Sequence, residues 1–136
     1  MNEKVKPQDL VRNLVTALDR RDLDAALATV SPKFRMYWVG EPDMVRNRKE
    51  YRTHWESYYA DHPDTRVKLV NVIEGTESVA AELSVSYLPK TRGSGPHGGA
   101  TGQRKRVEGR FAVFGELDSK GLIAVARLEN GRIGSE

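Results

Sequence analysis

The sequence lacks cysteine altogether, and it also lacks any long hydrophobic run. Without cysteine, neither a disulfide nor a thiolate-bound metal can hold the fold together. A membrane-spanning helix needs roughly 18 to 20 consecutive apolar residues, and no apolar run approaches that length. Residues 1–9 carry charges and precede no apolar stretch, so we expect no signal peptide and a cytoplasmic location.

A strong excess of one charge is missing as well. The chain has 22 lysines and arginines against 19 aspartates and glutamates, and the two signs are interleaved along most of it. Nucleic-acid-binding proteins usually gather basic residues on one face, so we expect neither a nucleic-acid nor a membrane partner. The 136 residues, 38% of them hydrophobic, suffice for a single domain over residues 1–136 with a well-buried core.

Apolar residues recur at helical spacing in three segments of the N-terminal half. The first predicted helix covers residues 8–19. Asp22 can cap a short second helix over 23–30, which the following Ser31-Pro32 pair should end. The third begins at Asn47 and ends before His62-Pro63, and its aromatic face consists of Tyr51, His54, Trp55 and Tyr58.

Strand-like segments fill most of the remaining chain, at residues 34–39, 67–73, 79–87, 104–117 and 122–128. In 79–87 apolar and polar residues alternate, which indicates a strand with one buried face. The glycine-rich stretch 93–102 predicts a flexible loop over residues 89–104, which could act as a lid.

Two parts of the sequence resemble a known family. Residues 10–24 resemble the opening helix, polar turn and Asp-Leu-Asp of the SnoaL-like branch of the nuclear-transport-factor-2-like superfamily, and residues 110–128 resemble its last hairpin. The resemblance implies an α+β cone, in which three N-terminal helices wrap a curved mixed β-sheet around a hydrophobic pocket. The superfamily includes cyclases, isomerases, dehydratases, epoxide hydrolases and binding proteins, so the fold alone does not assign the chemistry.

The reactive residues of these relatives are mostly replaced here. The ketosteroid isomerase positions for an oxyanion hole and a base align with Leu14, Arg110 and Tyr37. The reactive positions of limonene-epoxide hydrolases fall near Leu83, Val85 and Leu128. Glu108 is the nearest counterpart of the aspartate that SnoaL-like polyketide cyclases use as a base.

Four polar residues are therefore the catalytic candidates, namely His54, Tyr37, Glu108 and Arg110. An imidazole facing a pocket titrates near neutrality and can move protons, although a core histidine bonded to a strand is the alternative. The predicted substrate contacts are Trp38, Trp55, Tyr58, Leu83, Tyr87, Phe114 and Leu128, which would otherwise be ordinary core residues.

The face occupied by Glu108 and Arg110 is open between two interpretations. Alternation puts Val107, Phe111 and Val113 on one face and Glu108 and Arg110 on the other, and hydrophobicity favours the valine face as the interior. The family alignment implies the reverse. In that case an outer patch would be covered by a second subunit in a homodimer, and the patch consists of Val107, Phe111, Val113, Ile123 and Val125.

Three other signals carry little weight. The G-x-G-x-x-G of residues 93–98 has no helix after it, the three histidines share no metal-ligand spacing, and residues 103–106 form only a short basic cluster. We thus expect no metal and no cofactor.

The leading hypothesis is a cyclase, isomerase or dehydratase using acid–base chemistry on a small hydrophobic polyketide- or terpenoid-like intermediate. The alternative is a non-catalytic binding or assembly protein of the same fold.

Overall fold

The computed structural model describes residues 5–89 and 105–130 as three helices and six strands. The helices are α1 (Pro7–Asp19), α2 (Leu23–Leu27) and α3 (Arg48–Asp61). The strands are β1 (Val30–Trp38), β2 (Asp43–Val45), β3 (Arg66–Gly75), β4 (Ser78–Tyr87), β5 (Val107–Leu117) and β6 (Ile123–Asn130). Residues 90–104 of the predicted flexible loop lie outside the described part of the chain.

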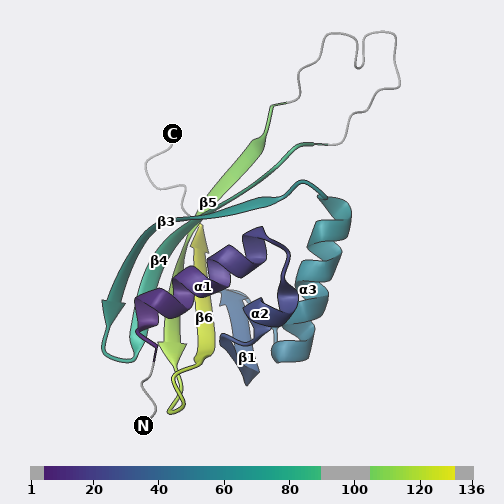
Figure 1. The fold of residues 1–136 in the computed structure, drawn as a ribbon. Coiled ribbons are helices and arrows are strands. Elements are labelled where there is room, and N and C mark those ends of the chain that lie inside the picture. The colour runs from purple at the N-terminus through teal and green to yellow at the C-terminus, as the bar shows by residue number, and fades with distance from the viewer. Residues whose placement is uncertain (1–4, 90–104, 131–136) are drawn as a thin grey trace, which may run out of the picture.

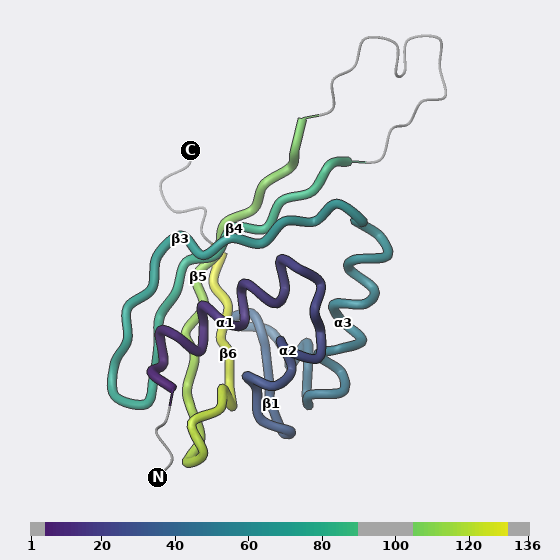
Figure 2. The backbone as a smooth tube through the Cα atoms, viewed as in Figure 1, coloured from purple at the N-terminus to yellow at the C-terminus, as the bar shows by residue number. Residues whose placement is uncertain are grey.

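All strands belong to one mixed sheet with the order β2-β1-β6-β5-β4-β3. β1 runs parallel to β6, while every other neighbouring pair is antiparallel. The sheet curves, and Figures 1 and 2 show the helices on one side of it, with α1 in front of the central strands and α3 beside β1. The predicted α+β cone is confirmed.

Local sequence signals explain where α1 and α3 begin and end. Pro7 occupies the start of α1, where its missing N–H costs nothing. The chain leaves this helix at Arg21, whose φ of 61° is left-handed. At the start of α3 the Asn47 side chain accepts a hydrogen bond from the Glu50 N–H at 2.8 Å, as the predicted cap requires.

The structure differs from the sequence prediction around residue 30. The second helix ends at Leu27, and β1 already starts at Val30, so that the Ser31-Pro32 pair lies inside a strand. Val30 is fully buried and pairs with Ile123, which favours the strand over one more helical turn. The edge strand β2 was not predicted because it has three residues and follows Pro42 directly.

Contacts between distant segments fix α1 and α3 against the sheet. The Asp19 carboxylate accepts hydrogen bonds from the Arg66 guanidinium (2.9 and 3.0 Å) and from the Val67 N–H (2.8 Å). The Tyr59 hydroxyl donates to the Leu18 carbonyl at 2.6 Å. These bonds connect the end of α1 to β3 and to α3.

Candidate functional site

The register of the central strands decides which side chains face the helices. Leu83 of β4 pairs with Phe111 of β5, and Ala81 pairs with Val113. Every second residue along these strands lines the space under the helices, from Val79 to Tyr87 on β4 and from Val107 to Gly115 on β5. Since side chains alternate along a strand, the intervening residues lie on the outer face.

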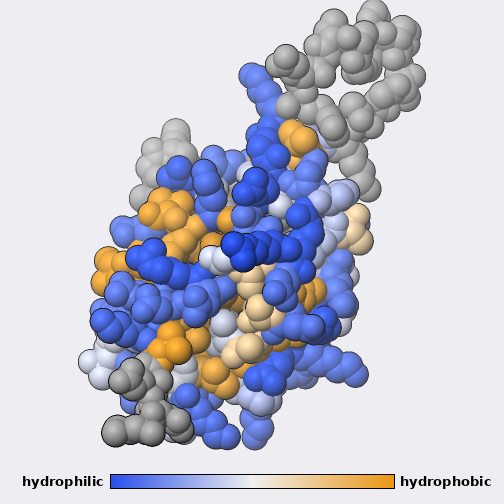
Figure 3. Space-filling view, in the orientation of Figure 1, coloured by the Kyte–Doolittle hydropathy of each residue, from blue (hydrophilic) through white to orange (hydrophobic). Residues whose placement is uncertain are grey.

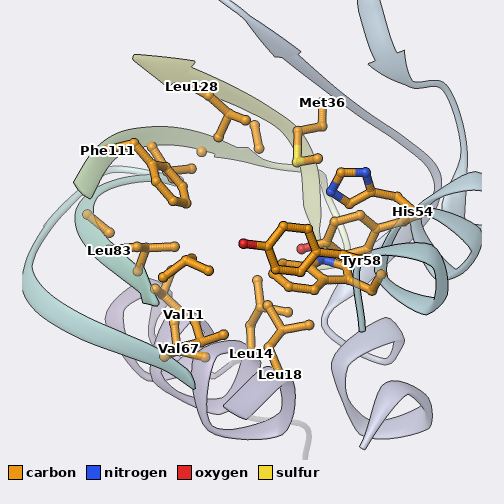
Figure 4. Close-up of a pocket in the computed structure, with 18 of the residues that line it drawn as sticks. Val11, Leu14, Leu18, Met36, His54, Tyr58, Val67, Leu83, Phe111 and Leu128 are labelled. Carbon is orange, nitrogen blue, oxygen red and sulfur yellow. The ribbon is translucent and has the colours of Figure 1, made fainter. Parts of the chain in front are cut away.

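The helices and the sheet enclose a cavity of about 370 Å³. Figure 4 shows Val11, Leu14 and Leu18 of α1 along one side, with His54 and Tyr58 of α3 opposite Leu83 and Phe111. Among the described lining residues Glu108 is the only charged one, and none is a lysine or arginine. The helix side of the molecule, seen in Figure 3, is largely hydrophilic with scattered hydrophobic residues, whereas the cavity is almost entirely apolar. Such a site suits an uncharged, mainly apolar ligand.

His54 is the only imidazole among the described residues that line the cavity. Its ring is partly buried and stands edge-on to Trp55, with ring centres 5.6 Å apart. Burial lowers the pKa of His54 below its ordinary value of 6.5, because the charged form loses hydration. At neutral pH the imidazole is therefore uncharged and able to accept a proton.

Hydroxyl and N–H groups of α3 supply the other polar atoms of this wall. Burial raises the pKa of Tyr51 to about 12, and the neighbouring Trp55 indole offsets part of this effect. The pKa of Tyr58 is also raised, first by burial and then by the adjacent Tyr87. Both phenols remain protonated at neutral pH and can donate hydrogen bonds.

Seven of the predicted site residues line the cavity: His54, Trp38, Trp55, Tyr58, Leu83, Tyr87 and Leu128. Glu108 also contributes to the lining, but its carboxylate accepts a hydrogen bond from Ser84 on the outer face and lies 3.7 Å from Arg110 Nε. The Ser84 hydrogen bond, followed by the charge of Arg110, lowers the pKa of Glu108. This carboxylate is ionised and does not point at the cavity.

The structure does not bring Tyr37, Arg110 or Phe114 to the cavity. The Arg35 guanidinium lies over the Tyr37 ring at 5.7 Å, and that of Arg127 lies over Phe114 at 5.9 Å. Arg110 is half exposed, with Nη1 3.8 Å from Glu82. The face implied by the family alignment is thus wrong and the one implied by alternation is right, because exposure spares these charges the cost of burial.

Most of the patch proposed as a dimer interface points inward, because the apolar face of β5 is the inner one. Val107, Phe111, Val113 and Ile123 line the cavity, and only Val125 belongs to the outer face. The apolar residues therefore need no second subunit to cover them. A homodimer through the outer sheet face stays a prediction, but an exposed apolar patch no longer supports it.

Sequence reasoning overlooked Tyr51 as a site residue. It lies one turn before Trp55 and three residues before His54, so the spacing that defined the aromatic face already placed it on the same wall.

Two further classes of site were tested within residues 5–89 and 105–130. No helix there is long and apolar enough to cross a membrane. In the same ranges no three histidine, aspartate or glutamate side chains come together in a way that could hold a metal ion.

An apolar cavity enclosed by α1, α3 and a curved mixed sheet agrees with the family comparison. The SnoaL-like domain family matches residues 11–133. This chain belongs to the SnoaL-like domain family. No curated protein sequence matches it significantly.

Solved structures share the fold of this SnoaL-like domain at low sequence identity. IdmH, a proposed polyketide cyclase from Streptomyces antibioticus, superposes with a TM-score of 0.72 at 15% identity, over 95% of this chain and 94% of that one. An LEH-like epoxide hydrolase from M. tuberculosis gives 0.67 at 19% identity, over 90% and 80%. A proposed ketosteroid isomerase from Kribbella flavida gives 0.67 at 14% identity, over 94% and 85%. At these identities the comparison establishes the fold alone.

Proposed function

We propose that this SnoaL-like domain binds a small hydrophobic, polyketide- or terpenoid-like molecule in its cavity and catalyses a cofactor-independent isomerisation, cyclisation or dehydration. The observation that carries the proposal is His54, a neutral imidazole on the wall of an otherwise apolar cavity. A base near its working pH in a water-poor site is what proton transfer from carbon requires.

The reaction step is proton abstraction next to a carbonyl group. An imidazole nitrogen of His54 takes the proton, the C–H electron pair forms a carbon–carbon double bond, and the carbonyl π electrons move to the oxygen. Where a neighbouring C=C bond extends the enolate to a dienolate, return of the proton from His54 to the γ carbon gives isomerisation. Attack of the enolate carbon on a second carbonyl, whose oxygen then takes the proton, gives cyclisation. Loss of a β-hydroxyl, which leaves as water with the proton from His54, gives dehydration. Neutral hydrogen-bond donors on α3 can stabilise the charge that develops on oxygen.

Deuterium exchange into 2-tetralone tests this chemistry without knowledge of the natural substrate. The ketone has acidic α protons on a compact bicyclic frame, and NMR in D2O follows their replacement. We expect the protein to accelerate exchange and His54→Gln to reduce that acceleration by roughly 100-fold, with ligand affinity changed only a few-fold.

His62→Gln is the matched control, because His62 stacks on Tyr87 at 3.9 Å but does not line the cavity. Exchange in this variant should stay within a few-fold of the parent protein. Equal exchange rates in the parent and the His54→Gln variant would eliminate the catalytic role of His54.

One observation favours a binding protein as the second candidate function. Family positions that carry reactive groups in relatives hold Leu14, Leu83 and Leu128 here, and all three line the cavity. Under this alternative the protein binds 2-tetralone but does not accelerate exchange between pH 5 and 9. Native mass spectrometry would then show a retained small molecule in protein purified from its host.

A further inference from the structure

Trp55 holds a buried donor that the structure leaves unpaired. Within the described residues, its indole Nε1 is the single buried side-chain nitrogen or oxygen without a hydrogen-bond partner. The side chain is 8% exposed, and it lines the cavity. Buried donors are almost always paired in folded proteins, so an exception on a cavity wall points to a partner that is absent from the protein itself.

The orientation of this indole is fixed by the rings around it. Tyr58 and Tyr59 lie with their ring centres 5.5 and 5.4 Å from that of Trp55, and His54 stands edge-on at 5.6 Å. Turning the N–H toward another acceptor would require these rings to move together. The unpaired state is therefore a property of the packed wall and is not relieved by a simple side-chain rotation.

A second neutral donor adjoins the first. Tyr51 lies one turn earlier on α3, and the Trp55 indole N–H comes close enough to its hydroxyl to lower the pKa of that phenol, although the contact lacks the geometry of a full hydrogen bond. Its phenol remains protonated because its pKa is raised by burial. Together the two groups offer N–H and O–H donors at one end of a cavity whose described lining contains no lysine or arginine.

We propose that the Trp55 indole N–H and the Tyr51 hydroxyl form an oxygen-binding pole, which holds the carbonyl oxygen of an uncharged ligand while its apolar body fills the rest of the cavity. A carboxylate or phosphate ligand is disfavoured, because no lysine or arginine among the described residues lines the cavity to replace its lost hydration. This inference rests on the proposed function in needing a ligand in the cavity, but it does not need turnover.

A matched ligand pair tests the pole: 2-tetralone and tetralin share one carbon frame and differ in a carbonyl against a methylene. The measured quantity is the ratio of their affinities, determined by calorimetry or NMR titration. We expect Trp55→Phe and Tyr51→Phe each to lower the ketone-to-hydrocarbon ratio by about fivefold, the usual effect of one neutral hydrogen bond. His62→Gln, which alters a ring outside the cavity lining, should leave the ratio within twofold.

The unaltered protein provides a second readout that does not depend on how the variants fold. Its two tryptophans give two indole signals in an ¹⁵N–¹H spectrum, and Trp38→Phe identifies the Trp55 signal. We expect 2-tetralone to move the Trp55 indole proton downfield relative to tetralin, since it gains an acceptor. The oxygen-binding pole would be refuted if both ligands shifted the Trp55 indole proton equally and the variants kept the ketone-to-hydrocarbon affinity ratio of the parent protein. Ligand binding itself would not be contradicted by that result. Failure of both ligands to bind would overturn the proposed function as well.

Discussion

Gly109 offers a direct way to separate ligand binding from stability. It lies on β5 facing the cavity, and a Cβ added there would meet no atom of the described residues within 4 Å, apart from its chain neighbours. Its neighbour Val107 is 43% exposed, so this part of the lining lies close to the cavity opening. Gly109→Leu should therefore place an apolar side chain into the space that a ligand needs.

The size of the effect follows from the volumes. A leucine adds four carbon groups, each comparable to the ~30 Å³ that a water molecule occupies in the liquid, or about a third of the 370 Å³ cavity. We expect the affinity for 2-tetralone to fall by more than tenfold. Stability should be unchanged or raised by up to about 1 kcal/mol, because glycine weakens a strand interior and the new side chain is partly buried.

Titration of 2-tetralone and urea denaturation measure the two effects on the same preparation. Gly109→Ala should keep binding, since a single methyl group fits the open space. Ala112→Leu adds three carbon groups on the outer face of β5 and should also keep binding. If Gly109→Leu bound the ketone as well as the parent protein does, the ligand would have to occupy another place, and the assignment of this cavity as the site would be refuted.

Three further predictions concern ionisation and helix anchoring. Burial lowers the pKa of His54, so below about pH 6.5 the unfolded chain takes up a proton that the folded protein resists, and folding stability should decline. Exchange activity should also decline as the pH falls and the imidazole becomes protonated. His54→Phe should flatten the curve of folding stability against pH between pH 6.5 and 5. Asp19→Ala should cost about 1 kcal/mol in urea denaturation, mainly through loss of the Val67 N–H bond, because Arg66 is exposed. In the parent protein the contribution of the carboxylate is present above pH 3.8 and is lost as the pH falls through the lowered pKa of Asp19, and an unchanged midpoint of Asp19→Ala at pH 7 would contradict the anchoring role. Tyr59→Phe should cost about 1 kcal/mol through the Leu18 carbonyl, and no loss on denaturation would mean that water replaces the bond.

Most of the fold could be predicted from local patterns. The apolar stripe of α1, the Asn47 cap of α3 and the alternation in β4 each involve residues close in sequence, so their signals are contained in short windows. The failures occur where tertiary pairing overrides the local pattern. Val30 extends a helical stripe, but its pairing with β6 makes it the first residue of a strand.

The site was predictable on α3 and only in part on the sheet. The predicted strand residues Trp38, Leu83, Tyr87 and Leu128 line the cavity, whereas Tyr37, Arg110 and Phe114 do not. Helical spacing alone places His54, Trp55 and Tyr58 on one face, and all three line the cavity. On β5 a shift of one residue exchanges the inner and outer faces, so a low-identity alignment that is off by one inverts every assignment. The hydrophobic alternation of β5 was the better guide. The opposite face would expose the apolar side chains of Phe111 and Val113 to water and bury the charges of Glu108 and Arg110, and each of these changes is unfavourable.

Most polar groups of the cavity lie on α3, so a change in the position of this helix affects all of them. The inward positions of β4 and β5 are apolar or glycine, apart from Tyr87, so the chemistry of the inner cavity depends on α3. His54, Trp55 and Tyr51 are fixed relative to one another by helical geometry, and a small displacement of α3 moves them together. That displacement is restrained at a distance, by the Tyr59–Leu18 hydrogen bond and by the Arg21 side chain on the Pro63 carbonyl. Substitutions at these anchors should therefore alter proton transfer and oxygen binding jointly, whereas substitutions on the sheet change the shape of the cavity and leave the reactive groups in place.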